Sequence, residues 1–145
     1  MKINFKKLSD LAKIPTNGSQ DAACYDLYAA TDKPLMIRPH ETVKVLLDIA
    51  IEVPVGTAGA IFPRSGLSSK HGLRPANCVG IIDPDYRGNV AVMLHNDSNV
   101  EQVIMSQERI AQFGLLPFIP IEWNEVEELS DTARGDGGFG STGRV

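Results

Sequence analysis

The last residues of the chain have the composition of a segment that could bind phosphate. Residues 134–143 read RGDGGFGSTG, and half of them are glycine. Glycine-rich backbone can wrap its amide groups around phosphate oxygens. Arg134 could pair with a phosphate, and Phe139 could stack on a nucleobase. Composition alone favours a disordered tail, because no apolar pattern ties these residues to a core. The alternative is a lid that becomes ordered over a nucleotide.

Two familiar glycine motifs do not fit this tail. Residues 138–143 match the GxGxxG dinucleotide fingerprint, but that fingerprint must open a helix and only Arg144 and Val145 follow it. Residues 135–141 resemble half of a P-loop but lack its lysine. The tail therefore remains either a disordered segment or a lid.

A second candidate for anion binding is the tripeptide Arg64-Ser65-Gly66. Pro63 precedes it and Gly72 lies where a helix would end, so we expect a short helix over about residues 66–70. The N-terminus of a helix offers free amide groups and a positive dipole end to an anion. A plain N-cap role for Ser65 explains the same pattern equally well.

The densest group of polar residues lies in residues 80–88, which read GIIDPDYRG. A turn between two strands explains Pro84, Asp85 and Gly88, because these residue types favour turns. It does not explain Asp83 and Tyr86, which are therefore candidate functional residues. Asp26, which follows Tyr25, is a third candidate carboxylate, although a lone aspartate at a strand end is usually only solvated. A serine–histidine–aspartate triad is disfavoured, because the chain has no nucleophile elbow.

Length and composition limit the classes of protein that remain. The chain has 145 residues and a mass of 15.7 kDa, which suits a single domain. Its net charge of −4 argues against a general binder of nucleic acid or anionic membranes, but not against a local basic pocket. Two cysteines without Cys-x-x-Cys spacing exclude a disulfide scaffold and a four-cysteine zinc site. Without a signal peptide or a long apolar run, we expect a cytoplasmic protein.

The elements that must position these residues are expected to be strands. Thirteen glycines and nine prolines divide the chain into windows that are mostly too short for a long helix. Within these windows apolar residues alternate with period two, over residues 42–51, 89–95 and 2–6. This pattern predicts an all-β sandwich, jelly roll or barrel. A second helix over residues 125–129 is a weaker expectation. We expect one β domain over residues 1–133 and a flexible glycine-rich lid over residues 134–145.

Five motifs in this order resemble the trimeric dUTP pyrophosphatase (dUTPase) family. They are residues 24–30 (CYDLYAA), 63–67 (PRSGL), 80–88 with Asn77 upstream, 108–112 (ERIAQ) and 134–143. The resemblance spans about residues 20–143. The family often has glycine at two positions where this chain has Cys24 and Gln107. These differences concern the geometry of turns rather than the chemistry of the site.

The resemblance implies a role for each matching residue. Asp83 would activate the attacking water, Tyr86 would pack beneath the deoxyribose, and Asp26 would help to place Mg²⁺ through its water shell. The remaining residues would bind the substrate. Asn77 and the backbone of Gly80, Ile81 and Ile82 would recognise uracil; Arg64, Ser65, Gly66 and Gln112 would bind the phosphates; Arg134, Phe139, Gly140, Ser141 and Thr142 would close over the nucleotide.

The resemblance also implies a fold and a reaction. The fold would be a jelly-roll-like (β-clip) subunit in a homotrimer whose subunits share active sites. The reaction would be the hydrolysis of dUTP to dUMP and diphosphate, which keeps uracil out of DNA and supplies dUMP for dTMP synthesis. Two alternatives remain open. One is a dCTP deaminase-like enzyme, which release of ammonia from dCTP would reveal, and the other is a catalytically silent regulatory trimer.

Overall fold

A computed structural model of the chain describes residues 1–138, and within them the protein is all-β apart from one short helix, α1 (Ser65–His71). This confirms the fold class expected from the sequence. The strands are β1 (Asn4–Lys7), β2 (Thr16–Asn17), β3 (Tyr25–Tyr28), β4 (Leu35–Ile37), β5 (Thr42–Leu46), β6 (Ile49–Glu52), β7 (Thr57–Phe62), β8 (Leu73–Pro75), β9 (Gly80–Ile82), β10 (Ala91–Asn96), β11 (Gln102–Ile104) and β12 (Arg109–Pro117).

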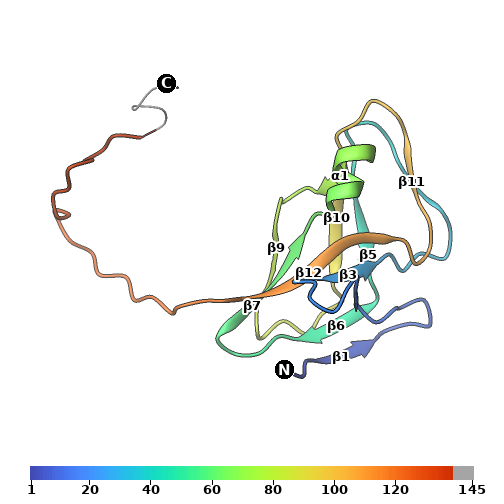
Figure 1. The fold of residues 1–145 in the computed structure, drawn as a ribbon, viewed down its shortest axis with the longest axis horizontal. Helices are drawn as coiled ribbons and strands as arrows, with labels where there is room; N and C mark the ends of the chain where they lie inside the picture. The colour runs from blue at the N-terminus through green and yellow to red at the C-terminus, as the bar shows by residue number, and fades with distance from the viewer. Residues whose placement is uncertain (139–145) are drawn as a thin grey trace.

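The strands form four small antiparallel sheets around one core (Figure 1). The largest has the order β2-β3-β12-β7-β9, and a second has the order β5-β10-β8. Strands β1 and β6 pair with each other, as do β4 and β11. Each sheet buries apolar side chains in the core, for example Phe113, Leu94, Ile51 and Ile104. Burial of this shared core is the main force that holds the sheets together.

The predicted period-two pattern over residues 42–51 is confirmed in its burial but not in its continuity. Val45, Leu47, Ile49 and Ile51 are buried. The expected single strand is nevertheless two strands, because β5 pairs with β10 whereas β6 pairs with β1. The chain changes partner at Asp48, whose φ is 51°. Alternation reports which face a residue occupies, but it does not report where a strand changes sheets.

Helix α1 confirms the predicted short helix with a shifted beginning. It begins at Ser65, so the N-cap is Arg64 rather than Ser65, and no side chain forms a capping hydrogen bond. The expectation that Ser65 is a plain N-cap is therefore wrong. Gly72 ends the helix at a φ of 66°, the left-handed conformation that glycine adopts without strain.

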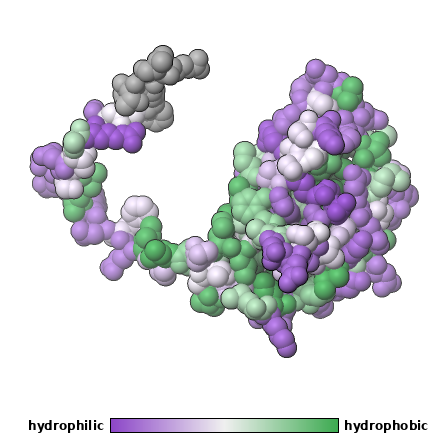
Figure 2. Space-filling view, viewed as in Figure 1, coloured by the Kyte–Doolittle hydropathy of each residue, from purple (hydrophilic) through white to green (hydrophobic). Residues whose placement is uncertain are grey.

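Residues 118–138 form an arm that leaves the body after β12 and contains no helix or strand (Figure 1). The helix expected over residues 125–129 is absent, so this prediction is wrong. Short helices are stabilised mainly by packing of an apolar face, and nothing within residues 1–138 covers the arm. Apolar side chains therefore remain exposed along it, with Ile119 at 86% and Trp123 at 88% (Figure 2).

Candidate functional site

Four polar side chains meet at one place, three from the five-stranded sheet and one from Arg64, the residue before α1. Strand β12 lies between β3 and β7, and its Gln112 pairs with Asp26 on one side and with Phe62 on the other. A register shift in β12 between Arg109 and Ala111 marks a bulge, which changes the direction of the strand. We call Asp26, Arg64, Arg109 and Gln112 the Asp26 cluster.

Direct contacts hold the Asp26 cluster together. The Nε of Arg64 donates to Oδ1 of Asp26 at 2.8 Å, and Nη1 of Arg109 donates to Oδ2 at 3.2 Å. The other end of the Arg64 guanidinium donates to the Arg109 carbonyl at 3.1 Å. Gln112 donates to the carbonyl of Pro63 at 2.9 Å, next to the start of α1. The cluster thus fixes both arginines and the entry to the helix.

The Asp26 cluster has an excess of positive charge. Two guanidinium groups share one carboxylate, and that carboxylate exposes only 13% of its side-chain surface. Ser65 and Gly66 follow directly and are exposed, and Gly66 has nothing within 4 Å of the position that a Cβ would occupy. The exposed Arg109 and the partly exposed Arg64, beside an open glycine backbone, suit a phosphate, because arginine pairs with its oxygens in a planar, bidentate way.

The second group of predicted residues lies on β9 and the turns at its two ends. We call Asn77, Gly80, Ile81, Ile82, Asp83 and Tyr86 the Asp83 edge, because β9 is an edge strand of the five-stranded sheet. The Tyr86 amide donates to the Asp83 carbonyl at 3.1 Å, which closes the turn after β9. The Tyr86 hydroxyl donates to the Asn89 carbonyl at 3.0 Å. A Cβ at Gly88 would lie 2.5 Å from that hydroxyl, so only glycine leaves room for the ring.

The two groups occupy different positions along β7. In the pairing of β7 with β9, Gly80 lies opposite Ile61 and Ile82 lies opposite Gly59. The Asp26 cluster lies at Phe62 and beyond. The Gly80 end of β9 is therefore nearer to the cluster, and Asp83 follows the end that is farther away.

Arg134, the one predicted tail residue that the structure describes, is not next to either group. Arg134 is exposed on the arm, and its Nε donates to the Gly137 carbonyl at 2.7 Å. Figure 1 shows this part of the arm well away from the body. Phe139, Gly140, Ser141 and Thr142 lie outside the described residues.

Comparison with known proteins assigns the chain to a family. The family model described as dUTPase matches residues 10–143. The chain belongs to the dUTPase family. The deoxyuridine 5'-triphosphate nucleotidohydrolase of Nautilia profundicola is 46% identical over 99% of this chain and 100% of its own length. The mitochondrial human protein of the same name is 45% identical over 99% of this chain and 56% of its own length. A variant of Staphylococcus bacteriophage 80alpha dUTPase, solved with dUpNHpp, superposes with a TM-score of 0.90 at 29% identity and 98% coverage of both chains.

One member of the Asp26 cluster in this dUTPase was missed at the level of sequence. Arg109 lies in the motif at residues 108–112, but the resemblance implies no role for it. The sequence shows the charge of Arg109 and its place three residues before Gln112, but it does not show the bulge in β12. Its contact with Asp26 makes it a candidate ligand for the phosphates beside Arg64.

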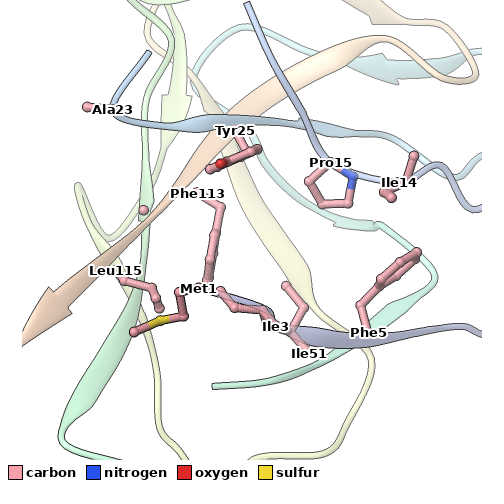
Figure 3. Close-up of a pocket in the computed structure, with 11 residues that line it drawn as sticks. Met1, Ile3, Phe5, Ile14, Pro15, Ala23, Tyr25, Ile51, Phe113 and Leu115 are labelled. Atoms are coloured by element: carbon pink, nitrogen blue, oxygen red, sulfur yellow. The ribbon is translucent and has the colours of Figure 1, made fainter. Parts of the chain in front are cut away.

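An apolar pocket of about 470 Å³ has no residue of the Asp26 cluster or of the Asp83 edge in its lining (Figure 3). Its lining includes Phe5, Ile14, Tyr25 and Leu115, which suit an apolar occupant rather than a triphosphate. Among residues 1–138 no three carboxylate, histidine or cysteine side chains gather as a metal site. No helix in that part of the chain is long and apolar enough to cross a membrane.

Proposed function

We propose that this dUTPase-family chain hydrolyses dUTP to dUMP and diphosphate. The observation that carries the proposal is the near full-length relationship to dUTP nucleotidohydrolases, together with the two polar groups expected for this chemistry. The related phage enzyme was solved with dUpNHpp, an analogue of dUTP. A dCTP deaminase and a silent regulatory trimer are not favoured by these relationships.

At the Asp83 edge, we propose that the exposed Asp83 orients and deprotonates the attacking water. A single carboxylate within hydrogen-bond reach is sufficient for this task. Tyr86, whose ring is fixed against Gly88, would pack beneath the deoxyribose and exclude a 2′-hydroxyl. Asn77 and the backbone of Gly80, Ile81 and Ile82 would bind the uracil edge. A Cβ at Gly80 would lie 3.3 Å from Nδ2 of Asn77, so the side chain of Asn77 borders this strand.

At the Asp26 cluster, we propose that Arg64, Ser65, Gly66 and Gln112 bind the phosphates, with Arg109 as an additional partner. Phosphoryl transfer depends mainly on positioning and on neutralisation of charge, which two arginines supply. Arg134 and residues 139–142 would close over the nucleotide, as the lid proposed for residues 134–145. Residues 1–133 would be the β domain, including the first part of the arm, and we propose a cytoplasmic location.

The donor set at the cluster fits Mg²⁺ only through water. Mg²⁺ commonly keeps several waters and binds one or two carboxylates together with substrate phosphates. The cluster offers one carboxylate, Asp26, and both of its oxygens already accept hydrogen bonds from arginine. Asp26 could accept further hydrogen bonds from waters around the ion. The ion would supply neutralisation of phosphate charge.

The test is the release of diphosphate from dUTP, dCTP, dTTP and UTP, measured side by side with purified protein. We expect turnover of dUTP to exceed that of the other three strongly, because a polar pocket leaves buried groups unpaired with the wrong base. Release of ammonia from dCTP would instead favour the deaminase. Binding of dUTP without turnover would favour the silent trimer.

The positions of the two groups support a site shared between chains. A nucleoside triphosphate presents base, sugar, α-phosphate and outer phosphates in that order. In one chain the base-binding end of β9, at Gly80, lies between Asp83 and the Asp26 cluster. Gly59, opposite the Asp83 end of β9, and Phe62, opposite Gln112, are already about 10 Å apart along β7, at about 3.3 Å per residue. A single chain therefore has these parts in the wrong order, so we propose that the cluster comes from a second chain.

The arm supports a third contribution. It leaves the body with Ile119, Trp123 and Leu129 exposed, and such side chains are usually covered by a partner surface. We propose a homotrimer in which one subunit supplies the Asp26 cluster, a second the Asp83 edge and a third the tail.

Mixing two inactive variants tests this arrangement. Asp83→Asn and a chain cut after Ala133 are each expected to fold and to have little activity. Random assembly of equal amounts should give about a quarter of wild-type activity, because each site receives an intact Asp83 and an intact tail independently. No recovery from verified mixed trimers would show that Asp83 and the tail come from the same chain.

A further inference from the structure

We propose that Arg74, held by Asp97, is a positioning residue for the turn that carries Asn77 and thereby sets the affinity for the base. This inference rests on the proposed function, in which Asn77 contacts uracil. Neither Arg74 nor Asp97 belongs to the motifs that resemble the family.

The Arg74 guanidinium connects Asp97 to the backbone just before Asn77. Its Nε donates to Oδ2 of Asp97 at 2.6 Å and its Nη2 donates to Oδ1 at 3.0 Å, a bidentate pair. Its remaining nitrogen, Nη1, lies 3.3 Å from the carbonyl oxygen of Pro75 and 3.5 Å from that of Ala76. These two contacts are long, so their geometry depends on how firmly Asp97 holds the group.

The turn needs support from outside because its own backbone is unusual. The Cys78 amide donates to the Pro75 carbonyl at 3.1 Å, and the Val79 amide donates to the Asn77 carbonyl at 2.6 Å. Cys78 has a φ of 62°, which is uncommon for a residue other than glycine. Such a conformation persists only where the surroundings determine it. Arg74 supplies part of that environment, because it contacts the carbonyl that closes the turn.

Asp97 is itself rigidly placed. Its amide donates to the Gly72 carbonyl at the end of α1, at 2.8 Å. The preceding Asn96 is fully buried, and its Nδ2 donates to the carbonyls of Ile37, Arg38 and Val100 at 3.0, 3.1 and 2.8 Å. The Arg74 hydrogen bond lowers the pKa of Asp97, and the same bond raises the pKa of Arg74. Both groups therefore remain charged at neutral pH.

This arrangement acts on binding rather than on chemistry. Asn77 lies in the turn before β9, whereas Asp83 follows β9. A change in the turn before β9 therefore leaves Asp83, the proposed general base, in place. Removal of Arg74 should weaken binding of the base and leave the reaction of bound substrate largely intact. The expected signature is a raised KM with little change in kcat.

The experiment compares Arg74→Met with the matched control Arg38→Met in the full-length protein. Arg38 is exposed, and no side-chain hydrogen bond of it is found in residues 1–138. We expect Arg74→Met to raise KM for dUTP about tenfold, to change kcat less than about threefold, and to lower the preference for dUTP over dCTP. Arg38→Met should leave all three unchanged. Arg74→Lys serves as a milder variant should Arg74→Met fail to fold, since lysine keeps the charge but lacks the planar fork with which arginine spans Asp97 and the turn carbonyls.

The exchanged pair Arg74→Asp with Asp97→Arg separates positioning from stability. It restores an ion pair but removes the donor beside Pro75 and Ala76, so we expect thermal stability to recover while KM stays high. Recovery of KM together with stability would overturn the proposal, as would an unchanged KM in Arg74→Met or Arg74→Lys. Equal effects of Arg74→Met and Arg38→Met would also overturn it. Wild-type protein without dUTP turnover would overturn the proposed function and this inference together, whereas an active wild type with unaffected variants would overturn this inference alone.

Discussion

The Asp26 cluster and the Asp83 edge are held in place in different ways. In the cluster, side chains from β3, from β12 and from the residue before α1 bind one another directly, through Asp26 and two arginines. On the edge, turn backbone and an edge strand place Asp83 and Tyr86, and both side chains remain exposed. Substitution in the cluster should therefore affect stability as well as activity, whereas substitution on the edge should affect chemistry or selectivity alone.

The largest expected effect is at Asp83. Asp83→Asn keeps the shape of the side chain but removes the base, so kcat should fall about 10²–10⁴-fold while nucleotide binding and the melting temperature stay nearly unchanged. Steady-state kinetics with dUTP and a thermal melt measure these quantities. The matched control is Asp85→Asn, the same change two residues away on the same exposed turn. An active Asp83→Asn variant would show that Asp83 is not the general base. The contrast between the Asp83 edge and the Asp26 cluster would then not hold.

Tyr86 should affect selectivity rather than stability. Tyr86→Ala opens space beneath the sugar, so we expect the preference for dUTP over UTP to narrow about tenfold or more, with a smaller loss in dUTP turnover. Tyr86→Phe keeps the ring and loses only the hydrogen bond to the Asn89 carbonyl, so it should retain the preference. The ratio of kcat/KM for the two substrates reports the effect. Equal losses on both substrates in Tyr86→Ala would mean that the ring supports the fold instead.

Asp26 should behave in the opposite way. Asp26→Asn leaves two arginines without their carboxylate, and we expect a loss of about 1–2 kcal/mol in the free energy of unfolding together with reduced activity. Asp32→Asn, an exposed aspartate with no ion pair in residues 1–138, is the control and should change neither. Urea unfolding and dUTP turnover measure the two effects. A variant of full stability would show that the cluster, like the edge, is held by backbone alone.

The sequence predicted whether a segment is a strand or a helix better than it predicted which strands pair with each other. The alternation over residues 42–51 correctly identified the buried side chains, but the exchange of sheets depends on Asp48. Its carboxylate accepts hydrogen bonds from Ser9 at 2.6 Å and from Asn89 at 2.8 Å, residues that are distant in sequence. Local period has no information on such contacts.

The candidate site shows the same limit. The motifs contain every residue of the Asp26 cluster, but the contact of Arg109 with Asp26 depends on the bulged pairing of β12 with β3, which has no local signature. The Arg74–Asp97 pair lay outside the motifs, since an arginine on one strand and an aspartate after another have no local signature. The prediction of a helix at residues 125–129 was wrong for a related reason, because nothing in the described part of the chain covers an apolar face on the arm.

The smallest expected effect is the pH dependence of the stability that the Arg74–Asp97 pair provides. The Arg74 hydrogen bond lowers the pKa of Asp97, so the folded state favours the charged carboxylate. The pair therefore stabilises the protein fully above the usual carboxyl pKa of about 4, and this contribution is lost as the pH falls through the lowered value. Asp97→Asn removes the same contribution at every pH. The difference in urea midpoint between wild type and Asp97→Asn should shrink as the pH falls from about 5 towards 3. Both groups are exposed, so the difference will be small even at neutral pH. A difference that grows as the pH falls from about 5 to 3 would mean that the charged Asp97 opposes folding, and the support that we assign to the turn carrying Asn77 would then have to come from elsewhere.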